Sequence, residues 1–136
     1  MKAREQPMSK QHSSHTPVLA LDMKRHLIRI HKSTLDCLNS PEYVQLLVNP
    51  QKRTIVVMCS NKGDHLAHKV PYDRIRRGKS FVLYSSYLLN RLNSISGECD
   101  PGATYRIYGK HNDDYNVVRF PLDELVDIST ERSNND

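Results

Sequence analysis

The stretch TLDCLNS, residues 34–40, has a counterpart further along the chain in LLNRLNS, residues 88–94. The two stretches match at four of seven positions with a constant offset of 54 residues. A strand-like apolar run precedes each of them, LIRI at 27–30 and FVLY at 81–84. Identical residues at matching positions, each set following a matching strand-like run, indicate an internal duplication.

Two further strand-like runs, separated by a turn or loop, follow each copy. The first copy continues with YVQLLV, the turn NPQK and TIVVM, and the second with TYRIY, the loop KHNDD and NVVRF. Each unit, at about residues 24–59 and 80–120, has the order strand, helix, strand, strand. This order predicts an α+β fold, in which two tandem β-α-β-β units form a largely antiparallel sheet with short helices on one face. Leu38 and Leu92 are the expected equivalent core positions.

Capping residues mark where the helices are expected to begin. Ser33 is the expected N-cap of the first helix, because an acidic residue follows three positions later as in a capping box. Ser85 or Ser86 is expected to cap the second helix. A final short helix is predicted over 121–128, since Pro121 suits a first helical turn and acids follow it there.

The chain of 136 residues has the length of one domain. Residues 1–16 and 129–136 lack apolar periodicity, which predicts a disordered basic N-terminal tail and a disordered C-terminal tail around a single domain at 17–128. The sequence has no apolar run of membrane-spanning length and no secretory signal pattern, so no membrane association is expected. Three widely spaced cysteines argue against a disulfide framework and favour a cytoplasmic location.

The stretch from HLIRIHKSTL (26–35) through PEYVQLLVNPQKRTIVV (41–57) resembles small, uncharacterised proteins encoded in phages and mobile elements of Gram-positive bacteria. The resemblance includes no motif with a known role. It implies no particular activity, so the function has to be inferred from the residues themselves.

Residue patterns for catalysis or metal binding are sparse. The sequence has no glycine-rich phosphate loop, no Gly-x-Ser-x-Gly elbow and no His-Glu-x-x-His helix, so neither enzymatic activity nor a cofactor is expected. His65 and His68 lack the further ligands of a zinc site, and no metal is predicted. Asp113 and Asp114 are expected to shape a turn, while Cys59 would need a converging histidine to act as a nucleophile.

Positive charge is concentrated in two groups. Residues 69–79 carry a net charge of +4, against a formal net charge of +5 for the whole chain, and a second group surrounds the run at 27–30. Clustered cations are typical of nucleic-acid-binding proteins, and the planar arginine fork holds two phosphate oxygens at once. The nucleic-acid-binding residues predicted in this way are Lys69, Arg74, Arg76, Arg77, Lys79, Lys24, Arg25, Arg29 and Lys32.

The geometry expected for the first group is an extended backbone. In such a segment Arg74 and Arg76 lie on one side and Arg77 on the other. Five tyrosines offer rings on which bases can stack and hydroxyls that can bond to phosphate. These tyrosines are Tyr72, Tyr84, Tyr87, Tyr105 and Tyr108.

We therefore expect a non-enzymatic nucleic-acid-binding or regulatory protein that contacts the phosphates of DNA or RNA through a basic loop. The alternative is a protein-interaction module, an inhibitor or adaptor, that uses an open sheet face or an edge strand. A homodimer is compatible with both. Salt-dependent retention of nucleic acid would favour the first hypothesis, and retention of a protein partner after nuclease treatment the second.

Overall fold

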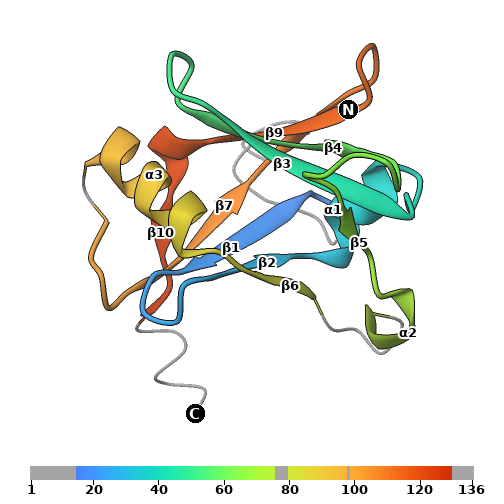
Figure 1. Ribbon diagram of the computed structural model, residues 1–136. Coiled ribbons are helices and arrows are strands. Elements are labelled where there is room, and N and C mark those ends of the chain that lie inside the picture. The colour runs from blue at the N-terminus through green and yellow to red at the C-terminus, as the bar shows by residue number, and fades with distance from the viewer. Residues whose placement is uncertain (1–14, 76–79, 98, 130–136) are drawn as a thin grey trace, which may run out of the picture.

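The computed structural model describes residues 15–75, 80–97 and 99–129, which form two antiparallel sheets and a few short helices (Figure 1). Each sheet has five strands, and one cluster of buried apolar side chains joins the two sheets. The predicted α+β class with antiparallel pairing is confirmed. None of the helices in these ranges combines the length and the apolar character needed to span a membrane.

Sheet A combines strands from both halves of the chain. Alternation along these strands points Leu19 and Ile107 into the core and leaves Ala20 and Arg106 on the outer face. Its strand order is β10 (Val126–Asp127), β7 (Thr104–Tyr108), β1 (Val18–Asp22), β2 (Leu27–Ile30) and β6 (Phe81–Tyr84).

Sheet B is built around two hairpins. The predicted turn between its second and third strands is confirmed, because Asn49 Oδ1 accepts hydrogen bonds from the backbone N–H groups of Gln51 and Lys52, both at 3.1 Å. A second hairpin, with its turn at 113–116, replaces the predicted loop at 110–114. The strand order is β5 (His68–Lys69), β3 (Tyr43–Asn49), β4 (Thr54–Cys59), β9 (Val117–Pro121) and β8 (Lys110–Asn112).

The helices close the space between the sheets at opposite ends (Figure 1). Near the end of β4, Cys59 Sγ lies 3.6 Å from the carbonyl oxygen of Leu38, which follows α1 (Lys32–Cys37). Near its start, Arg53 Nη1 donates to the carbonyl oxygen of Ile95 in α3 (Ser86–Ser96) at 2.8 Å. Each helix inserts leucines between the sheets, and the predicted burial of Leu38 and Leu92 is confirmed, at 1% exposure each.

The strands are divided between two sheets, where a single sheet with helices on one face was expected. The first strands of the two units, β2 and β6, pair with each other, but β3 lies in sheet B and β7 in sheet A. The two units therefore have the same order of strands and helix along the chain, but their strands do not pair in equivalent ways. Two facing sheets suit this sequence better than a single sheet, because the apolar face of each sheet covers the apolar face of the other.

Two local predictions are wrong in detail. The N-cap of α1 is His31, whose Nδ1 accepts from the backbone N–H of Ser33, so the predicted cap residue lies inside the helix. The predicted helix at 121–128 is only a 3₁₀ turn over Leu122–Glu124, after which the chain pairs with β7 as β10. Ser85 is the N-cap of α3 as predicted, and its Oγ accepts from the N–H of Leu88.

Hydrogen bonds hold both ends of the described domain. Ser33 Oγ donates to the carbonyl oxygen of Thr16 at 2.7 Å, and the N–H of Thr104 donates to Ser129 Oγ at 3.0 Å. Thr16 and Ser129, assigned to the tails by composition, are thus bonded to the domain. The rest of the predicted tails, apart from His15, lies outside the described residues.

Gly109 lies where the chain passes from β7 in sheet A to β8 in sheet B. A Cβ atom at this position would lie 2.6 Å from the Phe120 ring and 2.8 Å from the carbonyl oxygen of Arg119. Phe120 is fully buried, so its ring has little freedom to move away. The absence of a side chain therefore allows the crossing to pack directly against β9.

We predict that Gly109→Ala lowers the free energy of unfolding by roughly 1–3 kcal/mol, as overpacking of a closed core does. Gly102→Ala is the matched control, because its added Cβ would meet nothing closer than Asp100 Oδ1 at 3.6 Å. Urea unfolding of both variants and the wild type measures the difference. Equal stability of the two variants would show that the crossing does not require glycine.

Candidate nucleic-acid interface

A groove of about 910 Å³ lies along the β6 edge of sheet A. Strands β2 and β6 form one wall, and β5 with the short helix α2 (Tyr72–Ile75) forms the other. Four of the predicted cations line it, although they come from segments that are about 40 residues apart in the sequence. These residues are Arg25, Arg29, Lys69 and Arg74.

The pairing of β2 with β6 sets the first wall. Arg29 lies directly opposite Val82, and Leu27 directly opposite Tyr84, so these four side chains share the outer face of the sheet. The residues between them, such as Ile28, point into the core. The wall therefore presents a guanidinium beside an aliphatic side chain and an exposed tyrosine.

The second wall depends on α2. This segment is helical, whereas the sequence predicted an extended backbone around Arg74. The carbonyl oxygen of Pro71 accepts from the N–H groups of Arg74 and Ile75 at 3.0 and 3.3 Å, which closes a single helical turn. Ile75 is completely buried and Arg74 is exposed, so the turn anchors one side chain in the core while the other reaches the groove.

Tyr72 attaches α2 to the rest of the domain. Its hydroxyl donates a hydrogen bond to the carbonyl oxygen of Pro41, which precedes β3. Burial, and to a lesser extent the charges of Asp36 and Cys59, raises the pKa of Tyr72 to about 12. The hydroxyl consequently stays protonated and keeps donating at any physiological pH.

The groove is cationic in its described part. Arg25 is partly neutralised, because its Nε lies 3.9 Å from Asp22 Oδ2 and its backbone N–H donates to Asp22 Oδ1. Within the described ranges, no ion pair is formed by Arg29, Lys69 or Arg74. No acidic side chain lines the groove there. Such a surface attracts anions.

The remaining predicted cations are not all in the groove. Lys24 is exposed in the turn between β1 and β2 and does not line it. Lys32 lies on α1, where its Nζ pairs with Asp36 Oδ1 at 3.3 Å, so it belongs to a different surface. The other three, Arg76, Arg77 and Lys79, lie outside the described residues.

Among the candidate stacking residues, Tyr84 is the tyrosine that lines the groove, and its side chain is 77% exposed. Tyr105 is buried, and its hydroxyl accepts from the N–H of Asp100 at 2.7 Å. Sequence reasoning missed Arg106, which lies in the same outer row of sheet A as Arg29, with Ala20 between them. The alternation of TYRIY was the signal that could have identified it.

Two of the residues considered for chemistry, Cys59 and Asp113, have structural partners. Burial raises the pKa of the Cys59 thiol, which favours the weakly nucleophilic protonated form, and its Sγ contacts the carbonyl of Leu38 and the amide of Asn116. Asp113 pairs with His111 across 2.9 Å in the β8–β9 hairpin. No group of three or more His, Cys, Asp or Glu side chains converges within the described ranges.

In comparisons with protein families, with curated proteins and with solved structures, no match to this chain is found. The resemblance to phage and mobile-element proteins therefore stays a prediction. The basis for a functional proposal is the groove itself, with its cations and the exposed aromatic ring.

We predict that Tyr72→Phe lowers the free energy of unfolding by about 1 kcal/mol at pH 7, because the carbonyl of Pro41 loses its donor. The raised pKa means that this contribution is complete below pH 10 and is lost as the pH rises through about 12. Denaturant unfolding at pH 7, 9 and 11 measures it, with the exposed Tyr87→Phe as control. A difference that is absent at pH 7, or that grows at pH 11, would contradict the prediction.

Proposed function

We propose that this protein binds nucleic acid by holding the phosphate backbone in the groove between β2–β6 and β5–α2. The observation that carries the proposal is the convergence of Arg25, Arg29, Lys69 and Arg74 on one groove with no acidic side chain among its described lining residues. Two separate charge clusters of the sequence contribute to this one surface.

Arginine and lysine have distinct roles in this proposal. The guanidinium groups of Arg29 and Arg74 project from opposite walls, and each can hold two phosphate oxygens. Lys69 adds a point charge from β5. Contacts of this kind position the backbone without reading its sequence, so binding depends on salt and discriminates little between sequences.

Tyr84 adds a contact that phosphate alone does not provide. Its ring is exposed and stands on the same face of the sheet as Arg29, two residue pairs along the β2–β6 ladder. An aromatic ring beside phosphate-binding cations suits unpaired bases, which stack on it while the cations hold their backbone. The groove is therefore expected to favour single strands over duplexes.

The first prediction concerns the phosphates. Arg29→Ala combined with Arg74→Ala should weaken binding to unrelated sequences alike, because phosphate contacts carry no sequence information. The slope of log affinity against log salt should become shallower by roughly 0.7 per lost contact on single strands and roughly 0.9 on duplex DNA. Fluorescence anisotropy at several salt concentrations measures both quantities.

The matched control is Lys52→Ala combined with Arg119→Ala. This variant removes the same charge from the outer face of sheet B, and each pair contains one exposed and one half-buried cation. The control should leave affinity and slope close to those of the wild type. Equal losses in the two variants would show that overall charge, and not the groove, attracts nucleic acid.

The second prediction concerns the bases. Tyr84→Ala should lower affinity for single strands by roughly 1–3 kcal/mol, the contribution of one stacked base, and should change duplex affinity little. Tyr84→Phe keeps the ring and should bind as the wild type does. Tyr115→Ala is the control, since Tyr115 is similarly exposed, at 72%, on the other sheet. Equal losses for single strands and duplexes would refute stacking by Tyr84.

A further inference from the structure

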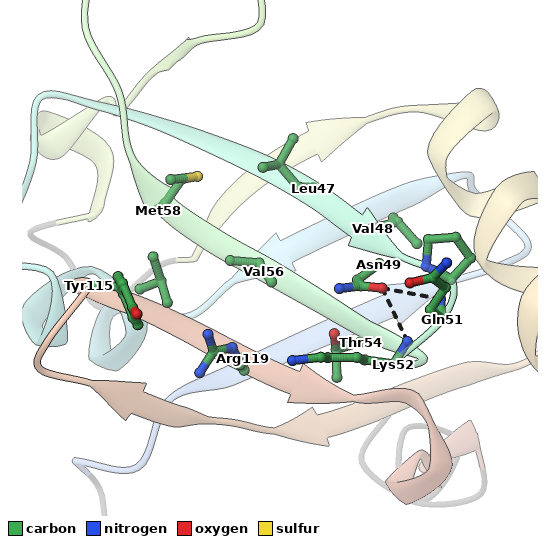
Figure 2. A pocket seen from close by; sticks show the side chains of 12 residues that line it. Leu47, Val48, Asn49, Gln51, Lys52, Thr54, Val56, Met58, Tyr115 and Arg119 are labelled. Atoms are coloured by element: carbon green, nitrogen blue, oxygen red, sulfur yellow. Dashed lines mark hydrogen bonds between the residues drawn. The ribbon is translucent and has the colours of Figure 1, made fainter.

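The outer face of sheet B carries an apolar surface that the nucleic-acid proposal does not use. Register places Leu47 opposite Val56, and Val56 opposite Arg119, while Met58 lies beside Val117 in the adjacent row. Figure 2 shows Val56 and Met58 along β4, with Leu47 to one side and Arg119 to the other. These side chains line a hollow of about 620 Å³.

Exposure of these side chains is unusual for a solvent-facing sheet. Leu47 is 40% exposed and Tyr115, from the β8–β9 turn, is 72% exposed, while Val56 and Met58 between them are half-buried. A contiguous apolar surface with a polar rim is typical of interaction sites. Here the aliphatic side chains form the middle of the surface.

Charge indicates the chemistry of the partner. Lys52 and Arg119 are the charged residues that line the hollow, and no carboxylate lines it in the described part of the chain. Lys110 continues the row beyond Arg119 on β8. A partner that covers the aliphatic centre therefore gains from acidic groups at its margins.

The backbone indicates the form of the partner. Strand β4, in the middle of this face, is hydrogen-bonded to β3 on one side and to β9 on the other, so it has no free ladder groups to offer a peptide. A segment that covers the face must satisfy its own N–H and C=O groups, and an α-helix does so. We propose that the outer face of sheet B binds an amphipathic helix of another protein, with an apolar stripe flanked by acidic residues.

Other occupants fit the surface less well. A second copy of the chain would bring its own Lys52 and Arg119 to the same face, where like charges repel. A nucleic acid would find Tyr115 as the aromatic ring of the hollow, among aliphatic side chains that do not stack with bases. The C-terminal end of the described chain does not lie on this surface, because Ser129 is hydrogen-bonded to Thr104 in sheet A.

The experiment is a selection from displayed helical peptides of roughly 18 residues, or about five turns. Their stripe positions are drawn from Leu, Ile, Phe and Met, and their flank positions equally from Glu, Lys and Gln. Immobilised full-length protein should enrich Glu over Lys in the flanks by about tenfold, as expected where like charges are excluded. Absence of enrichment, or enrichment that is indifferent to flank charge, would overturn the proposal.

Two variants test where the selected peptides bind. Leu47→Gln combined with Val56→Thr makes the face polar while Thr keeps a branched side chain in the strand, and this variant should lose at least about tenfold in affinity. Arg119→Glu should weaken the preference for Glu over Lys in the flanks, because Lys52 and Lys110 then remain as the cations of the surface. Tyr84→Ala, on the other sheet, should bind the selected peptides as the wild type does. Melting curves establish that all variants are folded.

Further outcomes would also reject the helix proposal. Peptides that bind Leu47→Gln/Val56→Thr unchanged would place their site elsewhere. A concentration-dependent dimer in sedimentation, abolished by that variant, would identify a second copy as the occupant. Nucleic-acid affinity that falls in that variant but survives in Arg29→Ala/Arg74→Ala would identify nucleic acid as the occupant, and would count against the proposed function as well.

Discussion

The antiparallel pairing of β2 with β6 is the contact on which both the core and the candidate site depend. Four residue pairs join segments that are about 54 positions apart in the chain. Their inner side chains, among them Ile28, Ile30 and Phe81, contribute to the core. Their outer side chains, among them Arg29 and Tyr84, line the groove. The same alternation that buries the core residues therefore assembles the candidate functional surface.

The groove also needs its second wall to be held in position. Helix α2 has four residues and too few internal hydrogen bonds to be stable alone. Ile75 in the core and the hydroxyl of Tyr72 on Pro41 fix it at two points, so Arg74 faces the groove from a defined position. A flexible loop would pay the entropy of ordering when it binds a phosphate, and this fixed turn avoids much of that loss.

The two outer sheet faces differ in chemistry although both consist of antiparallel strands. At the β6 edge of sheet A, arginines and a tyrosine surround a cationic groove, whereas on sheet B aliphatic side chains occupy the centre and cations the rim. The two surfaces share no lining residue, so a nucleic acid held in the groove would not have to cover the hollow. A protein with both would connect a nucleic acid to an acidic helix of a partner, which joins the two functional hypotheses that the sequence left open.

The sequence by itself determined the features that depend on a few neighbouring residues. The Asn49 turn, the Ser85 cap of α3, the buried Leu38 and Leu92 and the antiparallel α+β class all follow from local geometry and apolar spacing. Local reasoning was less accurate where a tertiary contact competes with propensity, as at α2, where burial of Ile75 stabilises a helical turn in a stretch expected to be extended.

Only the tertiary structure decided how the strands pair and which cations meet. The matched units predict equivalent places for β3 and β7, yet these strands lie in different sheets, and β1, which belongs to neither unit, is the central strand of sheet A. Pairing joins residues far apart in sequence, and its free energy depends on both apolar faces being covered at once. Arg29 and Arg74 therefore come to share a groove through β2–β6 pairing and the anchoring of α2, neither of which is encoded within the charged segments themselves.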